Sequence, residues 1–154
     1  MPHIHDKIDF TVEVFIVYKD RVLLRKHDKY KMWLSVGGHV ELDEDPNEAA
    51  LREVREETGL NIKLVGEVKK FAPLAGYKEL MSPRFLNRHY INETHEHVTL
   101  VYFATTDDNK VIQGEKEISD DIHWFTATEL DNSQYTLRES VRYYAQEALK
   151  ELND

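Results

Sequence analysis

The sequence predicts an α/β fold, with a central mixed β-sheet held between helices in an α/β/α layering. Several short segments show the apolar alternation or the continuous apolar runs that are typical of strands. One of them, residues 98–104, is apolar on both faces, as expected of a central strand that is covered on both sides. Two other segments begin with helix-start signals and continue with helical apolar spacing. Strands mixed with two such helices favour the layered arrangement.

The composition is that of a globular domain with an acidic surface. The chain has 154 residues, 41% of them hydrophobic, and 20 Lys and Arg against 29 Asp and Glu, a formal net charge of -9. This length is enough to bury a core, and no repeat or linker interrupts it, so residues 1–154 are expected to form a single domain. The absence of cysteine excludes disulfides and thiolate sites, which leaves carboxylates and the eight histidines as the strong metal ligands.

No segment predicts membrane insertion or export. The apolar runs fall well short of the roughly 18 residues that span a bilayer, and residues 1–10 lack the basic and apolar regions of a signal peptide. We therefore expect a cytoplasmic protein with no membrane partner. Because an acidic surface repels phosphates, a nucleic acid polymer is not an expected partner either, and a phosphorylated substrate would need local cations or a metal.

The first two strands are predicted to form a hairpin. Residues 10–18 alternate and then run apolar, which is typical of a strand. Residues 19–21, Lys-Asp-Arg, are typical of a turn, and residues 22–25 would be the second strand.

A helix is predicted to begin at residue 46. Asp45 is a suitable N-cap, Pro46 would occupy the first helical position, and Glu48 would complete a capping box. Gly59 is suited to the left-handed conformation that ends a helix. The apolar stripe of this helix consists of Ala49, Ala50, Leu51 and Val54.

The next region is harder to interpret. Residues 62–71 alternate as a strand, whereas residues 73–96 show no sustained period. A segment of that length exceeds the roughly 12 to 15 residues typical of a loop inside a compact domain. It is therefore either functional or contains a short element that the pattern does not reveal.

The chain is predicted to finish with a short strand and an amphipathic helix. Residues 122–125 would be the final strand. Thr136 and Glu139 have the spacing of a capping box that opens the helix. The apolar residues that would share one face of this helix and cover the sheet are Leu137, Val141, Tyr144, Ala145, Ala148 and Leu152.

Three carboxylates on the first helix form a candidate metal site. Glu53, Glu56 and Glu57 stand at positions i, i+3 and i+4, so they share one face with Cβ atoms about 5–6 Å apart. Two such charges roughly 5 Å apart repel by about 3 kcal/mol at an effective dielectric near 20, and a hard divalent cation such as Mg²⁺ or Mn²⁺ would remove that repulsion. The ordinary alternative is a solvated acidic face, where a like-charge pair costs only a few tenths of a kcal/mol.

The residues around these glutamates favour the metal site. Residues 38–60 match the pattern G-x5-E-x7-R-E-U-x-E-E-x-G-U at every fixed position, where U is a bulky aliphatic residue. At average residue frequencies the chance of such a match is on the order of one in a billion at a given site. This segment resembles the Nudix box, and the chain resembles the Nudix hydrolase superfamily, to which MutT belongs. The resemblance implies the family's sandwich of a mixed sheet between helices, which agrees with the fold expected above.

The resemblance also implies an activity and a set of metal ligands. The activity is metal-dependent hydrolysis of a nucleoside diphosphate linked to another moiety, as in a nucleoside triphosphate, a dinucleoside polyphosphate or a sugar nucleotide. By position in the box, Glu53 and Glu57 would be the principal ligands of Mg²⁺ or Mn²⁺, and the carbonyl of Gly37 a further ligand. Glu56 would be either another ligand or the general base.

Supporting roles follow from the same resemblance. Arg52 would orient the glutamates by a charge-assisted bond, and Glu44 would anchor the loop from behind the ligands. Family members differ in the position of the general base and often recruit a later acidic loop. Here Glu117 is preferred slightly over Glu115 for that role, with a solvated loop as the equal alternative. The chain departs from many family members at Val36, where they carry proline.

Substrate contacts are predicted from isolated side chains. Trp33 could stack on a base, although a lone tryptophan more often anchors a loop in the core. Tyr77 lies about as far beyond the box as a tyrosine that the family associates with dinucleoside polyphosphate hydrolysis, but the chain has eight tyrosines. Arg84, Arg88 and His95 belong to a basic segment that could receive phosphate.

The histidines of this segment leave alternatives open. His95 and His97 would share one face of a strand, where they could contact phosphate, stay exposed, or bind zinc with a carboxylate. Because the sequence offers no third histidine at a fixed close spacing, zinc ranks below the other two.

Three function classes therefore remain. The first is an active pyrophosphohydrolase on a nucleotide-like small molecule. The second is a catalytically silent nucleotide-sensing or interaction module, which usually loses box glutamates that are all present here. The third is a diphosphate isomerase relative, which normally relies on cysteine and ranks last. Family members are often homodimers, but nothing in the sequence identifies an interface.

Overall fold

The computed structural model describes residues 7–27, 29–114 and 121–152. Its first two strands, β1 (Ile8–Tyr18) and β2 (Arg21–Lys26), form the predicted antiparallel hairpin. Lys19 takes a positive φ of 54° in the turn between them.

The remaining elements follow in chain order. They are β3 (Trp33–Leu34), β4 (Val36–His39), α1 (Pro46–Thr58), β5 (Lys63–Leu64), β6 (Phe85–Asn92), β7 (His95–Thr105), β8 (Asp121–Phe125), α2 (Ala127–Leu130) and α3 (Glu139–Leu152). Within the described ranges, eight strands form one mixed sheet in which β1 and β7 run parallel and the other pairs run antiparallel. The parallel pairing extends from Ile8 opposite Glu96 to Val17 opposite Thr105, so β1 and β7 form the centre of the sheet.

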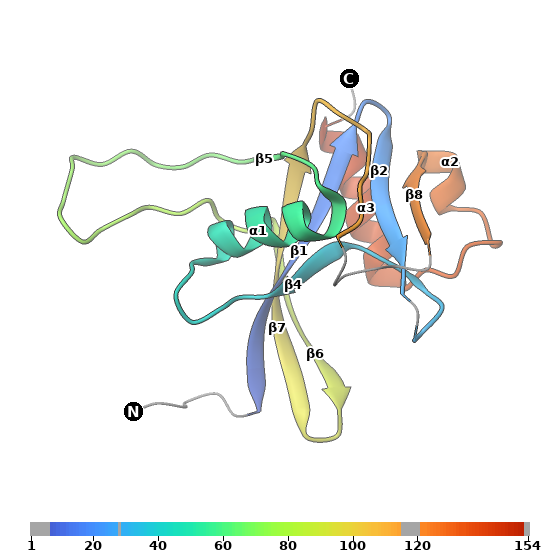
Figure 1. Ribbon diagram of the computed structural model, residues 1–154, viewed down its shortest axis with the longest axis horizontal. Helices are drawn as coiled ribbons and strands as arrows, with labels where there is room; N and C mark the ends of the chain where they lie inside the picture. The colour runs from blue at the N-terminus through green and yellow to red at the C-terminus, as the bar shows by residue number, and fades with distance from the viewer. Residues whose placement is uncertain (1–6, 28, 115–120, 153–154) are drawn as a thin grey trace.

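The two long helices cover opposite faces of this sheet, which confirms the predicted α/β/α layering (Figure 1). Because successive residues of a strand point to opposite faces, β1 divides its apolar residues between two cores. Val14 and Ile16 pack in the core that contains Ala50 of α1. Phe15 and Val17 pack in the core that contains the apolar residues of α3.

Helix α1 begins and ends where the sequence predicts. The Asp45 side chain accepts a hydrogen bond from the backbone N–H of Glu48, the Glu48 side chain accepts one from the backbone of Asp45, and Pro46 is the first helical residue. Gly59 has a φ of 73° and donates its N–H to the carbonyl of Arg55. These local signals confirm both caps.

Helix α3 begins later than predicted. The capping box expected at Thr136 is wrong, because the helix starts at Glu139. The backbone before the helix pairs with β3 instead: the N–H of Trp33 donates to the carbonyl of Thr136 at 3.0 Å, and Leu137 bridges Trp33 in parallel. Pairing with a strand edge thus replaces the first turn of the predicted helix.

The region between α1 and β7 also differs from the prediction. The strand expected over residues 62–71 is wrong beyond Leu64, where the chain leaves the sheet as a long exposed loop (Figure 1). The unpatterned segment does contain a hidden element, strand β6, which pairs antiparallel with β7. None of the helices in the described part of the chain is both long and apolar enough to cross a bilayer.

Candidate active site

The motif of residues 38–60 is organised around one arginine. The guanidinium of Arg52 donates to both carboxylate oxygens of Glu44, from Nε to Oε2 at 2.9 Å and from Nη2 to Oε1 at 2.7 Å. Its Nη1 donates to Glu53 Oε1 at 3.0 Å and to Glu56 Oε2 at 3.1 Å. Its Nη2 also donates to the backbone carbonyl of His39 at 2.9 Å. One side chain therefore joins the loop before α1, the acidic face of α1 and the end of β4.

Within this network, Arg52 and Glu44 each stabilise the charged form of the other. The hydrogen bond from Arg52 lowers the pKa of the Glu44 carboxyl, and the Glu44 carboxylate in turn raises the pKa of the guanidinium. The side chain of Glu44 is only 10% exposed and that of Arg52 24% exposed, so solvent screens this pair incompletely.

Glu53 and Glu57 lie one helical turn apart and are both buried, with 7% and 1% of their surface exposed. Glu56, on the same acidic face, has a half-exposed side chain. Gly38 of β4 passes directly over Glu53, and a Cβ atom built on this glycine would lie 2.4 Å from both Cδ and Oε1 of that glutamate. A glycine at this position keeps free the space that the carboxylate occupies.

A second arginine, which the sequence interpretation missed, contacts the deepest glutamate. Nε of Arg25, on β2, lies 3.0 Å from Oε2 of Glu57. The Arg25 side chain is 17% exposed, so the ion pair sits largely inside the protein. A charged residue at the end of an otherwise buried apolar strand was the signal that could have identified it.

The donor set at this face fits a hard divalent cation. Glu53 and Glu57 offer carboxylate oxygens, which Mg²⁺ and Mn²⁺ prefer. Burial of two carboxylates one turn apart is costly unless cations compensate them, and here Arg25 and Arg52 each contact one of the two. The space kept by Gly38 over Glu53 completes the fit.

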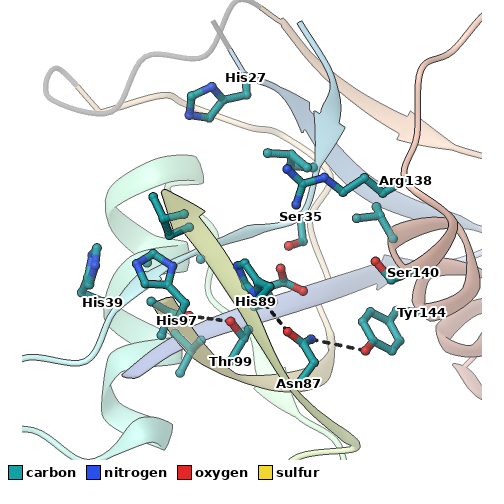
Figure 2. A pocket seen from close by; sticks show the side chains of 18 of the residues that line it. His27, Ser35, His39, Asn87, His89, His97, Thr99, Arg138, Ser140 and Tyr144 are labelled. Carbon is teal, nitrogen blue, oxygen red and sulfur yellow. Dashed lines mark hydrogen bonds between the residues drawn. The ribbon is translucent and has the colours of Figure 1, made fainter. Parts of the chain in front are cut away.

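A cleft of about 530 Å³ opens on the other side of the paired glycines, between β1, β4, β6, β7 and the start of α3. Figure 2 shows His89 and His97 facing Arg138, Ser140 and Tyr144 across it. Two residues that line this cleft also contact the glutamates, Arg25 at Glu57 and Gly38 at Glu53.

The floor of the cleft contains a carboxyl group with an unusual pKa. Burial raises the pKa of Glu13, in the middle of β1, to about 7, while the positive charge of Arg138 opposes the shift. Burial and Arg138 together lower the pKa of His89. Both Glu13 and Arg138 were missed by the sequence interpretation. Glu13 had a signal, as a charged residue between apolar neighbours in the middle of a long strand, whereas nothing in the local pattern marks Arg138.

The side chains predicted to contact substrate do not gather at one place in the structure. Arg88 lines the cleft and forms an ion pair with Glu96. Arg84 is not among the cleft residues and pairs with Glu151 of α3. Trp33 lies in the core, 6% exposed, where its ring centroid is 5.1 Å from that of Phe125; this agrees with the loop-anchor alternative.

The remaining predicted contacts also lie away from the cleft lining. Tyr77 is exposed on the long loop, and its hydroxyl donates to Glu79. His95 contacts Asp9 near the starts of the two central strands, β7 and β1, and is not among the cleft residues. Glu117, the preferred general base, and Glu115 lie outside the described residues.

Comparison with known protein families matches residues 9–147 to the NUDIX domain. Among solved structures, a hydrolase of the NUDIX family from Clostridium perfringens is 35% identical to this chain. The two structures superpose with a TM-score of 0.81 over 94% of this chain and 98% of that one.

Two curated relatives are similar over shorter stretches. The m7GpppN-mRNA hydrolase NUDT17 of Xenopus laevis is 35% identical over 58% of this chain. A probable DHNTP pyrophosphohydrolase of Lactococcus lactis is 32% identical over 42% of this chain. The aligned parts span only 35% and 39% of the lengths of these relatives.

Proposed function

The chain belongs to the NUDIX family, and from this premise we propose that it is a pyrophosphohydrolase that requires Mg²⁺ or Mn²⁺ and cleaves a nucleoside diphosphate linked to another moiety. The observation that carries the proposal is the pair of buried carboxylates, Glu53 and Glu57, with Gly38, which also lines the cleft, packed directly against Glu53. A purely structural acidic helix face would be solvated and would need no such cover.

In this proposal Glu53 and Glu57 hold the cation, the carbonyl of Gly37 is a further ligand, and Glu56 is either another ligand or the general base. A bound Mg²⁺ or Mn²⁺ would neutralise the charge that develops on the diphosphate and activate water. Arg52 fixes the carboxylates through its contacts with Glu53 and Glu56, and its two hydrogen bonds with Glu44 fix the guanidinium in turn.

The cleft would receive the rest of the substrate. Arg138 supplies positive charge there, and the backbone of Gly37 and Gly38 presents no side chain between the cleft and the glutamates. Glu13 and Asn87 offer hydrogen-bonding groups suited to the edge of a base. Both curated relatives are named for nucleotide substrates, a capped mRNA and DHNTP, which supports the nucleotide class without choosing a member.

Two residues compete for the role of general base. Glu56 is the exposed member of the acidic face, and Glu117 belongs to a later acidic segment of the sequence. We expect the base variant, Glu56→Gln or Glu117→Gln, to lose turnover while keeping its affinity for Mn²⁺. A ligand variant would lose both.

The experiment that tests the proposal screens the purified protein against nucleoside triphosphates, dinucleoside polyphosphates and sugar nucleotides, with Mg²⁺ and then Mn²⁺. Glu57→Gln is the test variant, and Glu147→Gln on α3, a helix outside the motif, is the matched control. We expect one substrate class to be hydrolysed, a loss of at least about 100-fold in Glu57→Gln, and no change in the control.

A different result would redirect the assignment. Nucleotide binding without hydrolysis of any member, while Mn²⁺ still binds, would overturn the enzymatic proposal in favour of a sensing module. Hydrolysis that persists in Glu57→Gln would remove the box glutamates from the mechanism.

A further inference from the structure

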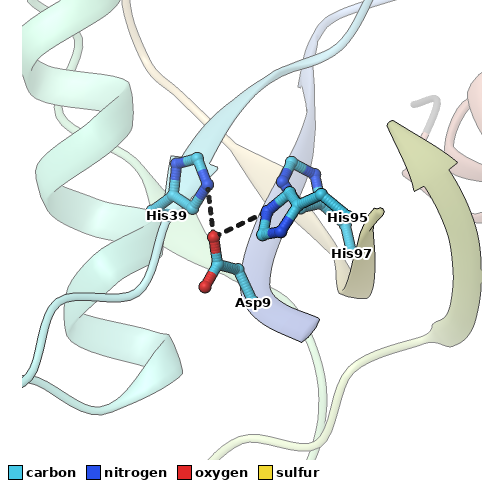
Figure 3. Close-up of side chains that lie close together, drawn as sticks. All are labelled: Asp9, His39, His95 and His97. Carbon is cyan, nitrogen blue, oxygen red and sulfur yellow. Dashed lines mark ion pairs between the residues drawn. The ribbon is translucent and has the colours of Figure 1, made fainter. Parts of the chain in front are cut away.

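Three histidines and one aspartate form a cluster of which two members, His39 and His97, line the cleft. Figure 3 shows His39, His95 and His97 around Asp9. Nε2 of His95 lies 2.9 Å from Oδ2 of Asp9, and Nε2 of His39 lies 3.5 Å from the same oxygen. The four side chains can each offer one ligand atom, and these atoms all lie within 4.8 Å of one another.

The sheet register brings these residues together. Asp9 of β1 stands opposite His97 of β7, and His39 of β4 stands opposite Thr11, two residues along β1 from Asp9. His95 and His97 are two residues apart on β7. Since directly opposed residues and residues two apart share one face of a sheet, all four side chains emerge on the same face.

We propose that Asp9, His39, His95 and His97 form a second metal site, which binds a borderline transition-metal ion of the zinc class rather than Mg²⁺. Three imidazoles and one carboxylate are a donor set typical of Zn²⁺, whereas Mg²⁺ prefers oxygen alone. The box glutamates, in contrast, offer only oxygen donors, which suit Mg²⁺. The two sites would therefore select different cations.

The cluster is exposed enough for an ion to enter, and its side chains need to move only slightly to surround the ion. Tetrahedral ligands at zinc distances are separated by about 3.3 Å, so the widest separation in the cluster must shorten, while the contacts of Asp9 with His39 and His95 are already near this value. The His39 side chain is 58% exposed and that of Asp9 42% exposed, which leaves both free to turn toward the ion.

An anion is the less suitable occupant. Phosphate at this position would face the carboxylate of Asp9, which lies against two of the three histidines. A cation gains from that carboxylate and also from the neutral imidazoles. Simple ion pairing accounts for one histidine beside a carboxylate, as for His123 and Glu129 on the far part of the sheet, but not for three imidazoles around one carboxylate.

The proposed ion would reinforce the border of the cleft. His39 ends β4, and its backbone carbonyl accepts a hydrogen bond from Arg52 of the glutamate network. Metal bound by side chains from β1, β4 and β7 would hold this end of β4 against the central strands. The proposal does not depend on hydrolytic activity, because its readout is metal binding itself.

The test is a Zn²⁺ titration of the full chain against a competing chromophoric chelator, with excess Mg²⁺ to occupy oxygen-only sites. All proteins carry His3→Gln and His5→Gln, so that zinc bound by these two histidines is not counted. His97→Gln and the exposed His39→Gln remove ligands. His123→Gln removes a histidine of the other carboxylate pair and is the matched control.

We expect one Zn²⁺ per chain in the background protein and in His123→Gln, and at least about tenfold weaker binding in both ligand variants. Co²⁺ added in place of Zn²⁺ should give the intense visible absorption of a low-coordinate site, lost in the same two variants. Equal thermal unfolding of all variants in chelator would show that the fold is retained. If His97→Gln fails to fold, His39→Gln carries the test.

Three results would overturn the proposal. One is the absence of zinc binding in the background protein. Another is equal zinc affinity in His39→Gln, His97→Gln and the background. The third is inorganic phosphate binding that depends on His39 and His97 in a protein that binds no zinc.

Discussion

Gly38 lies so close to Glu53 that a Cβ atom built on the glycine would be 2.4 Å from Oε1 of the glutamate. An alanine at this position must push the carboxylate or the strand aside, because real Cβ contacts are not that short. Gly38 is thus needed to leave room for the carboxylate of Glu53, in addition to its role in the backbone.

Gly38→Ala should therefore impair the metal site more than the fold. We expect at least about tenfold weaker Mn²⁺ binding, measured from the signal of free Mn²⁺ by electron paramagnetic resonance. Gly76→Ala, on the long exposed loop, is the control: its φ of 77° strains an alanine locally, but the Cβ meets nothing within 4 Å and so crowds no carboxylate. Unchanged Mn²⁺ affinity in Gly38→Ala would contradict the crowding argument.

Replacing Arg25 should destabilise the protein through Glu57. Arg25→Met keeps most of the side-chain volume but removes the cation 3.0 Å from a glutamate that is 1% exposed. The expected loss in unfolding free energy is about 3 kcal/mol in urea, and the double variant with Glu57→Gln should recover much of it. The exposed Arg55→Met is the control. A loss no larger than that of the control would show that the pair is not coupled.

Arg52→Lys should weaken the site without removing its charge. A lysine cannot reproduce the two hydrogen bonds to Glu44 together with those to Glu53 and Glu56. We expect turnover or Mn²⁺ affinity to fall by about 10- to 100-fold. Arg55→Lys on the same helix should have no effect. Full activity in Arg52→Lys would mean that a positive charge at this position is enough to organise the glutamates, without the hydrogen bonds of the guanidinium.

Glu129 should make stability depend on pH on the acid side. Hydrogen bonds from the backbone N–H of Thr126, and then from His123, lower the pKa of Glu129 below its usual 4.5. The folded state thus prefers the carboxylate, so its contribution is complete above pH 4.5 and is lost as pH falls through the lowered value.

The measurement compares the wild type with Glu129→Gln by urea unfolding. We expect the wild type to be more stable by about 1 kcal/mol near neutral pH. This advantage should shrink over the range below pH 4.5. An advantage that stays constant across this range would contradict the lowered pKa.

The helix of the motif was predictable because its signals are local. Asp45, Pro46, Glu48 and Gly59 act within one turn of the residues they cap, so no distant contact is needed to read them. The face shared by Glu53, Glu56 and Glu57 follows from helical spacing in the same way.

Strand β6 was not predictable for a physical reason. Its partly buried residues include Asn87 and His89, which line the cleft, while Leu86 and Tyr90 on the alternate positions are exposed. Where a strand borders a polar site, polar side chains can be the more buried ones and apolar side chains the exposed ones. The alternation of apolar residues that usually reveals a strand is then missing. The start of α3 was misplaced because pairing of Leu137 with Trp33 overrode the capping pattern around Thr136.

The sequence by itself determined the layered fold class, the first helix and the glutamates on one of its faces, since each depends on residues within a few positions of one another. Only the tertiary structure decided that Arg25 meets Glu57, and that Asp9 and His39 join the two histidines of β7. These contacts depend on the register of strands that are far apart in the chain, and register is set by the packing of the whole sheet. The sequence argument therefore found too few histidines for zinc, because the missing ligands belong to other strands.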